Sequence, residues 1–208
     1  MKKFFAVILF FASSLPFKHV FANSFFENPV FFVGAQGNLN FASVEGGEKA
    51  GGFGGGILLE GGVDFNALQF SGSVAFDHAG SGGKVDNLNE TKIGVAAAYL
   101  FDARNFPSLP KFIAIRAQTA FWLDIYYGTV YKSASTKNAG QSDSVSGVSF
   151  AFAPIVAVEF PNLIFVKDFN IVPYVSLSEI MRPENEGLLL STSVSLGARL
   201  YFSKLGGK

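Results

Sequence analysis

Few residues in this chain have the chemistry that catalysis requires. His78 stands beside Asp77 and three positions before Ser81, so the residue types of a hydrolytic triad occur together. They are nearly consecutive, however, at the end of an alternating segment and in a glycine-rich stretch, and this spacing does not imply triad geometry. Cysteine is absent, which excludes disulfides and thiolate metal sites. We therefore expect no enzyme, and we predict no catalytic, cofactor or metal site.

The glycine-rich run GGFGGG, residues 51–56, superficially resembles a phosphate-binding loop. It lacks the Gly-Lys-Ser/Thr end of a P-loop and the helix that would follow it. We expect it to form a flexible external loop instead.

The remaining candidates are charged residues set among small and polar ones. Asp77 and Lys92 are expected to pair across neighbouring strands near one mouth of the fold. A second group, expected to form a polar cluster towards the other end, consists of Asp64, Arg116, Glu159 and Arg199. Arg116 is expected to pair with Glu159, and Arg199 to reach Asp64 across one intervening strand or to reach Glu159. Because an unpaired buried charge is costly, the cluster is either interior packing or a gate in a narrow ion path.

These charges lie on eight segments whose apolar residues recur at every second position, the period of a β-strand. In the first segment Phe31, Val33, Leu39 and Phe41 alternate with small and polar residues. The eight segments cover residues 31–42, 57–66, 68–77, 92–101, 113–125, 148–160, 169–178 and 188–202. Each has ten residues or more, which is enough for the roughly 9–11 that a tilted transmembrane strand needs.

The two faces of these strands predict a membrane barrel rather than a soluble one. One face is Phe, Ile, Val and Leu, and the other is Gly, Ala, Ser, Asn and Gln with about one charge per strand. The second face suits the crowded interior of a small barrel, and the first suits lipid. A soluble secreted barrel of the lipocalin type would need the opposite arrangement. We predict an all-β fold, a closed antiparallel eight-stranded transmembrane barrel of up-and-down meander order.

The connections and aromatic residues agree with this orientation. Polar, glycine- or serine-rich loops are expected at 44–55, 78–91, 129–146 and 179–187 and are assigned to the cell exterior. A tight turn near residue 66 and two more apolar connections, 102–111 and 161–168, are assigned to the periplasm. Aromatic residues near both ends of the strands predict two interfacial bands. The periplasmic band is Phe31, Phe65, Phe101, Phe160, Phe169 and Phe202, and the outer band is Phe41, Phe76, Tyr127 and Phe150.

The first 22 residues read as a secretory signal peptide. Lys2 and Lys3 precede an apolar stretch, and Val20-Phe21-Ala22 fits a cleavage site. We therefore assign residues 1–22 to the signal peptide and 23–208 to one barrel domain. Three of the 16 basic residues lie in the signal segment, so the remainder is slightly acidic. Nothing in it forms a basic footprint for nucleic acid.

The chain resembles the small outer-membrane barrels of the OmpA, OmpX and OmpW type of Gram-negative bacteria. The resemblance rests on the signal peptide, the eight strands and an aromatic-terminated last strand. It implies that Ser195, Gly197, Leu200 and Phe202 form the segment read by the barrel-assembly machinery. Unlike many members, this chain continues past the aromatic with SKLGGK, residues 203–208.

Two functions follow from this class. The first is a structural or surface-interaction barrel in the outer membrane, in contact with lipid and lipopolysaccharide. Its external loops, 129–146 above all, would contact host molecules or phage. The second is a narrow pore for ions or small solutes, unless Trp122, Tyr174 and the charged cluster block the lumen, because eight strands leave little room.

Overall fold

A computed structural model describes residues 29–45, 52–65, 67–80, 85–103, 106–131, 142–161, 163–166, 169–184 and 187–202. The predicted signal peptide, the residue 203–208 tail and Ser81 lie outside the described residues, as do the central parts of three of the four predicted external loops. No helix in the described part of the chain is long and apolar enough to cross a membrane.

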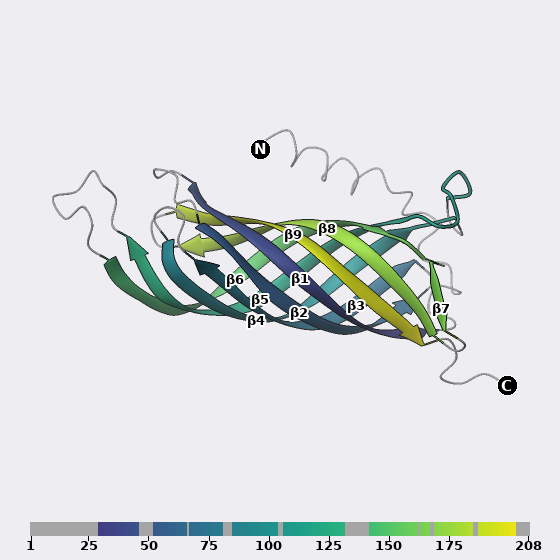
Figure 1. Ribbon diagram of the computed structural model, residues 1–208, viewed down its shortest axis with the longest axis horizontal. Coiled ribbons are helices and arrows are strands. Elements are labelled where there is room, and N and C mark those ends of the chain that lie inside the picture. Colours follow the sequence, from purple (N-terminus) through teal and green to yellow (C-terminus); the bar gives the residue numbers. More distant parts are fainter. Residues whose placement is uncertain are drawn as a thin grey trace.

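The described residues form nine antiparallel strands (Figure 1). They are β1 (Val30–Glu45), β2 (Gly52–Phe65), β3 (Leu68–Gly80), β4 (Val85–Phe101), β5 (Ala114–Tyr131), β6 (Ser142–Glu159), β7 (Ile164–Val166), β8 (Phe169–Glu184) and β9 (Gly187–Phe202).

Eight of these strands close a barrel in meander order, as predicted. β1 pairs with β2 on one side and β9 on the other, and β6 pairs with β8. The strands cross the long axis of the molecule at a steep tilt (Figure 1), which closure of a barrel requires. β1 begins and β9 ends at the same end, where Phe32 faces Tyr201. We call this the basal end and the opposite one the distal end.

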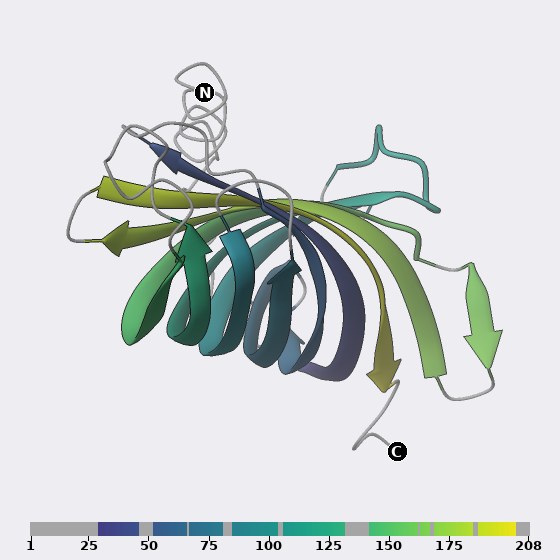
Figure 2. The same ribbon diagram turned by 60° about the vertical axis from the view of Figure 1, so that its left-hand side comes forward.

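The short strand β7 was not expected from the sequence. It pairs with the first residues of β8, Val166 opposite Phe169 and Ile164 opposite Ile171. β6 instead pairs with β8 further along, from Tyr174 onwards. In Figure 2, β7 lies beside the start of β8, at the margin of the barrel. The apolar connection 161–168 therefore contributes an extra ladder rather than only a turn.

The large apolar side chains point outwards. Leu196 is 69% exposed, Phe150 76% and Ile57 55%, whereas the neighbouring positions on the same strands are buried or half-buried. A contiguous exposed apolar surface of this extent is not tolerated in water. In lipid it is the expected outer face of a barrel, whose backbone groups are satisfied by closure.

The outward apolar band has a measurable height. Phe31 and Phe41 lie ten residues apart on β1, which at about 3.3 Å per residue and a tilt of about 40° spans roughly 25 Å. This is the height of the apolar band of outer-membrane barrels. At its distal edge some outward residues are polar: His78 bonds to Asn89 (3.0 Å), and Thr192, which pairs with Phe41, donates to Glu179 (3.2 Å).

The strands extend further distally than predicted. Gly52 to Gly56 belong to β2, so the expectation of a flexible GGFGGG loop was wrong for these residues. The external connections are therefore shorter than the predicted loops, because β3 reaches Gly80, β5 reaches Tyr131, and Glu184 pairs with Gly187. Backbone ladders need no apolar side chains, so pairing continues past the apolar band. The outer aromatic residues, such as Tyr127, therefore lie before the strand ends rather than at them.

Candidate functional site: the barrel interior

The barrel interior contains three tiers of side chains. The basal cluster comprises Gln36, Glu60, Asp64, Gln69, Arg116, Glu159, Tyr174, Arg199 and Tyr201. The middle layer is apolar, with Leu58, Trp122, Ile155 and Ile180 among alanines. The distal cluster comprises Asn38, Asn40, Asp77, Glu90, Lys92 and Asp124.

Arg199 is the centre of the basal cluster and is 1% exposed. Its Nε donates to Oε1 of Glu60 (2.6 Å) and its Nη2 to Oε2 (2.7 Å), a bidentate ion pair. Its Nη1 donates to Gln69 (2.8 Å) and to Glu159 (3.3 Å). The guanidinium also lies 4.6 Å from the Phe32 ring centroid. Such a planar, bidentate and stacked site suits arginine and not lysine.

Arg116 joins the same cluster through Glu159. Its Nε lies 2.8 Å from Oε1 of Glu159, the carboxylate oxygen that Arg199 also approaches. The guanidinium carbon of Arg116 lies 4.8 Å from the Tyr174 ring centroid, and the Tyr174 hydroxyl donates to Gln36 (2.7 Å). One carboxylate therefore bridges two arginines. The predicted contact between Arg116 and Glu159 is present in the structure.

Asp64 lies in the basal cluster but is linked to Arg199 through an amide. Nε2 of Gln69 donates to Oδ2 of Asp64 (3.1 Å), while Oε1 of Gln69 accepts from Arg199. The bidentate partner of Arg199 across strand β1 is Glu60, which the sequence analysis did not select. Glu60 and Asp64 are both inward positions of β2, and the register puts Glu60 level with Gly34 and Arg199.

A signal for Glu60 was present in the glycines. Gly34 lies between Glu60 and Arg199 in the ladder, and a Cβ there would be 2.8 Å from Oε1 of Glu60. Absence of a side chain on the middle strand lets the two flanking side chains meet above it. The same arrangement recurs at three more inward glycines, namely Gly56 (Asn38 with Asp77), Gly94 (Ser73 with Trp122) and Gly197 (Gln36 with Tyr174).

The distal cluster surrounds one buried lysine. Nζ of Lys92 lies 2.8 Å from Asp77 and 2.5 Å from Glu90, and Asp124 is directly opposite it on β5. Asn38 and Asn40 donate to the same oxygen of Asp77, at 3.2 and 2.8 Å. The predicted contact between Asp77 and Lys92 is therefore present, together with partners from β1 and β5.

The middle layer lies between the two clusters on most strands. On β1 the clusters are linked directly, because Nε2 of Gln36 donates to Oδ1 of Asn38 (2.8 Å). On β2 the inward order is Glu60, Leu58, then Gly56 beside Asp77, and on β5 Trp122 lies between Arg116 and Asp124. Nε1 of Trp122 donates to Oγ of Ser73 (3.1 Å). Trp122 and Leu58 are buried in one cluster with four alanines of neighbouring strands and with Ile180. Side chains thus fill the barrel at this height.

The structure gives no support to a His78-based active site. Asp77 is buried and inward, whereas His78, the next residue of β3, is exposed and outward. Adjacent residues of one strand point to opposite faces, so this acid and this imidazole cannot act on one substrate. In the described ranges, no group of three or more His, Cys, Asp or Glu residues could hold a metal ion.

The residues of the predicted assembly segment all lie on β9. Ser195 is buried, and Gly197 faces Gln36 and Tyr174. Leu200 is paired with Val33, and Phe202 contacts Phe169 with ring centroids 5.8 Å apart. The segment is thus the last barrel strand up to its final aromatic, and its role in assembly stays a prediction.

Comparison with known proteins identifies the architecture. The chain has the fold of a small eight-stranded outer-membrane β-barrel. It is similar to neisserial surface protein A, with a TM-score of 0.55 at 16% identity over 86% of this chain and 100% of that one. It also matches Ail of Yersinia pestis (TM-score 0.47, 14% identity, 84% and 99% covered) and OprG of Pseudomonas aeruginosa (0.46, 8%, 85% and 96%). No family model and no curated protein sequence matches the chain.

Proposed function

We propose that this protein is an integral outer-membrane barrel with a filled interior and a structural or surface-interaction role, and that it is not a pore. The observation that carries the proposal is the sequence of three tiers across the lumen. A path for hydrated ions would have to pass the Arg199 network, the Trp122 layer and the Lys92 cluster in turn. Each tier is held by several strands.

The two ionic tiers support a structural role in particular. Arg199 bonds to residues of β2, β3 and β6, and the distal cluster joins β1, β3, β4 and β5. Charged groups fixed on both sides by opposite charge and hydrogen bonds cross-link strands that are not neighbours. Opening a path would require breaking several charge-assisted bonds in a water-poor interior, each strong there.

The expected partners follow from the surfaces. Membrane lipid would cover the outward apolar band, and lipopolysaccharide would meet its distal edge near His78 and Glu179. The β9 segment ending at Phe202 would be read by the barrel-assembly machinery. Ligands of host or phage origin would bind the external connections, most of which lie outside the described residues.

Localisation provides the direct experiment for residence in the membrane. Expressed in a Gram-negative host, the protein should fractionate with the outer membrane. It should also migrate faster on a denaturing gel before boiling than after, because closed barrels resist detergent. Recovery in the soluble periplasmic fraction, with no mobility change on heating, would refute membrane residence.

A further inference from the structure

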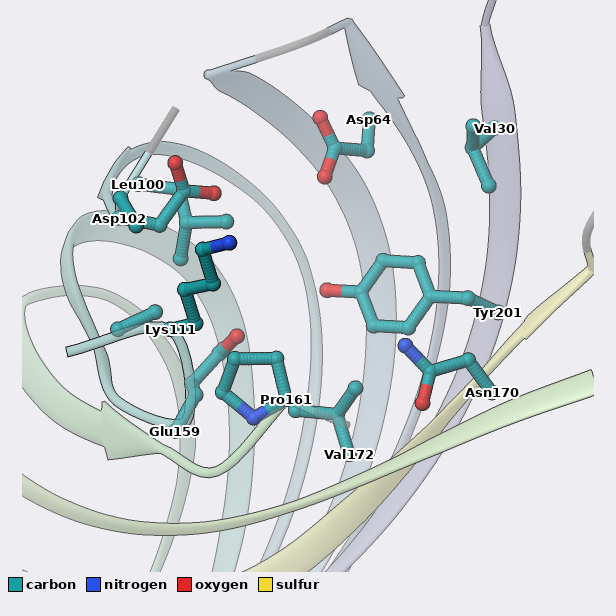
Figure 3. A pocket seen from close by; sticks show the side chains of 12 residues that line it. Val30, Asp64, Leu100, Asp102, Lys111, Glu159, Pro161, Asn170, Val172 and Tyr201 are labelled. Atoms are coloured by element: carbon teal, nitrogen blue, oxygen red, sulfur yellow. The ribbon is translucent and has the colours of Figure 1, made fainter. Parts of the chain in front are cut away.

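A cavity of about 490 Å³ opens at the basal end, beneath the Arg199 network (Figure 3). Asp64 of β2, Glu159 of β6, Asn170 of β8 and Tyr201 of β9 all point into it (Figure 3). Its remaining lining residues are Val30, Leu100, Asp102, Ala103, Lys111, Ala114, Pro161 and Val172. This volume lies in the range of small-molecule sites, as does the mixture of apolar walls with a few polar groups.

The polar groups of the wall are held in place from above. Nε2 of Gln69 donates both to Oδ2 of Asp64 and to the hydroxyl oxygen of Tyr201, each at 3.1 Å. Gln69 is itself fixed by Arg199. Side chains locked by such supporting bonds make a preorganised site, because little freedom is lost when a ligand binds.

The charge of the wall favours a cationic ligand. Its lining residues include three carboxylates, Asp64, Asp102 and Glu159, and one cationic side chain, Lys111. Because Glu159 is already paired with Arg116 and Arg199, the excess negative charge comes from Asp64 and Asp102 against Lys111. Oδ1 of Asn170 is a further buried acceptor with no hydrogen-bond partner in the described part of the chain. No acidic group in the described ranges has the arrangement of a metal site, and Val30, Leu100 and Val172 line the rest of the cavity. These features together fit an organic cation better than a metal ion.

We propose that the basal cavity binds small organic ammonium compounds with an apolar body. The charged nitrogen would lie among Asp64, Asp102 and the Tyr201 hydroxyl, and the apolar part would contact Val30, Leu100 and Val172. This proposal rests on the barrel fold and is independent of whether the barrel conducts ions.

The test compares three probes of the same shape and different charge on the full chain in lipid nanodiscs. Benzylammonium, benzyl alcohol and benzoate are titrated while backbone NMR shifts are followed at Asp102, Asn170 and Tyr201. Benzylammonium should shift these signals with a dissociation constant on the order of 1 mM. Benzyl alcohol should bind at least fivefold more weakly, and benzoate should give no saturable shift. Equal binding of all three, or no binding of benzylammonium, would overturn the proposal.

Two matched variants locate the site. Asp102→Asn should weaken benzylammonium binding at least fivefold, whereas Asp124→Asn, the same change in the distal cluster, should leave it unchanged. Equal effects of the two variants would mean that the probe responds to overall charge and not to this cavity. If Asp102→Asn does not fold, as its NMR spectrum would show, Tyr201→Phe and the three-probe comparison on the unmodified chain decide the matter.

Discussion

Arg199 of β9 and Glu60 of β2 form a bidentate ion pair across strand β1, with bonds of 2.6 and 2.7 Å, directly above Gly34. The two residues are separated by a whole strand, and they meet because the intervening residue has no side chain. The basal cluster is therefore a property of the closed barrel and not of any single hairpin.

Replacing Gly34 by valine should destabilise the barrel by about 2–4 kcal/mol, because the new side chain must displace a buried ion pair. A Cβ at this position would lie 2.8 Å from Glu60 Oε1 and 3.0 Å from Arg199 Cγ. Gly37→Val is the matched control on the same strand, since a Cβ there meets nothing within 4 Å. Urea unfolding in lipid vesicles measures the free energy of unfolding of both variants. Equal stability of the two variants would show that the space above Gly34 is not critical.

A double-mutant cycle should show that Glu60 and Arg199 are energetically coupled. Glu60→Gln and Arg199→Met should each cost about 3–5 kcal/mol, because each leaves the other charge buried without its partner. The double variant should cost less than the sum by about 1–3 kcal/mol, with Glu159 still held by Arg116. Additivity to within about 0.5 kcal/mol would contradict a direct interaction.

Gly94→Ala should disturb the middle layer, and the fluorescence of the single tryptophan, Trp122, should show this change. A Cβ at Gly94 would lie 2.1 Å from Cδ1 of Trp122 and 2.2 Å from the Phe121 carbonyl oxygen. We expect altered tryptophan fluorescence and a loss of about 1–3 kcal/mol. Gly72→Ala is the control, because its nearest contact would be at 3.9 Å. The same emission spectrum in Gly94→Ala as in the unchanged protein would mean that Trp122 does not occupy this position.

A charged residue on the outward face should destabilise the barrel, as it does on a lipid-facing surface. Leu196→Arg, at a position 69% exposed within the apolar band, should cost about 2–4 kcal/mol. Thr192→Arg is four residues earlier on β9, at the distal edge of the apolar band beside Glu179, and should cost about 0–1 kcal/mol. A fully exposed leucine on a water-facing surface would tolerate arginine, so a neutral Leu196→Arg would argue against lipid contact.

Strand positions and faces could be predicted from the sequence because side chains alternate between the two faces of a strand. Once one face is apolar, a shift of the strand by one residue would put every apolar side chain on the wrong face. The contacts of Arg116 with Glu159 and of Asp77 with Lys92 follow, since each joins adjacent hairpin strands. Glu60 was missed because contacts between next-nearest strands depend on the register of two ladders at once. Gly34 was the available signal, but it could be interpreted only with that register.

The strand ends could not be predicted for a different reason. The apolar pattern stops where the lipid-facing band stops, near Tyr127 and Phe150, whereas β5 and β6 continue to the pair Tyr131 and Ser142. Antiparallel hydrogen bonds between backbones hold these extensions together, and their side-chain sequence carries no period. Strand β7 was missed because three residues are too few to show alternation.

Single-channel recording in planar lipid bilayers tests the filled interior most directly. Reconstituted at high protein-to-lipid ratio in 1 M KCl, the unmodified chain should insert without producing stable conductance steps, because three tiers of side chains block the lumen. A variant carrying Arg199→Ala and Trp122→Ala together, if it folds, should conduct more than the unmodified chain, which would show that the assay detects an opened barrel. Reproducible, discrete steps from the unmodified chain would contradict the filled interior and favour a narrow pore.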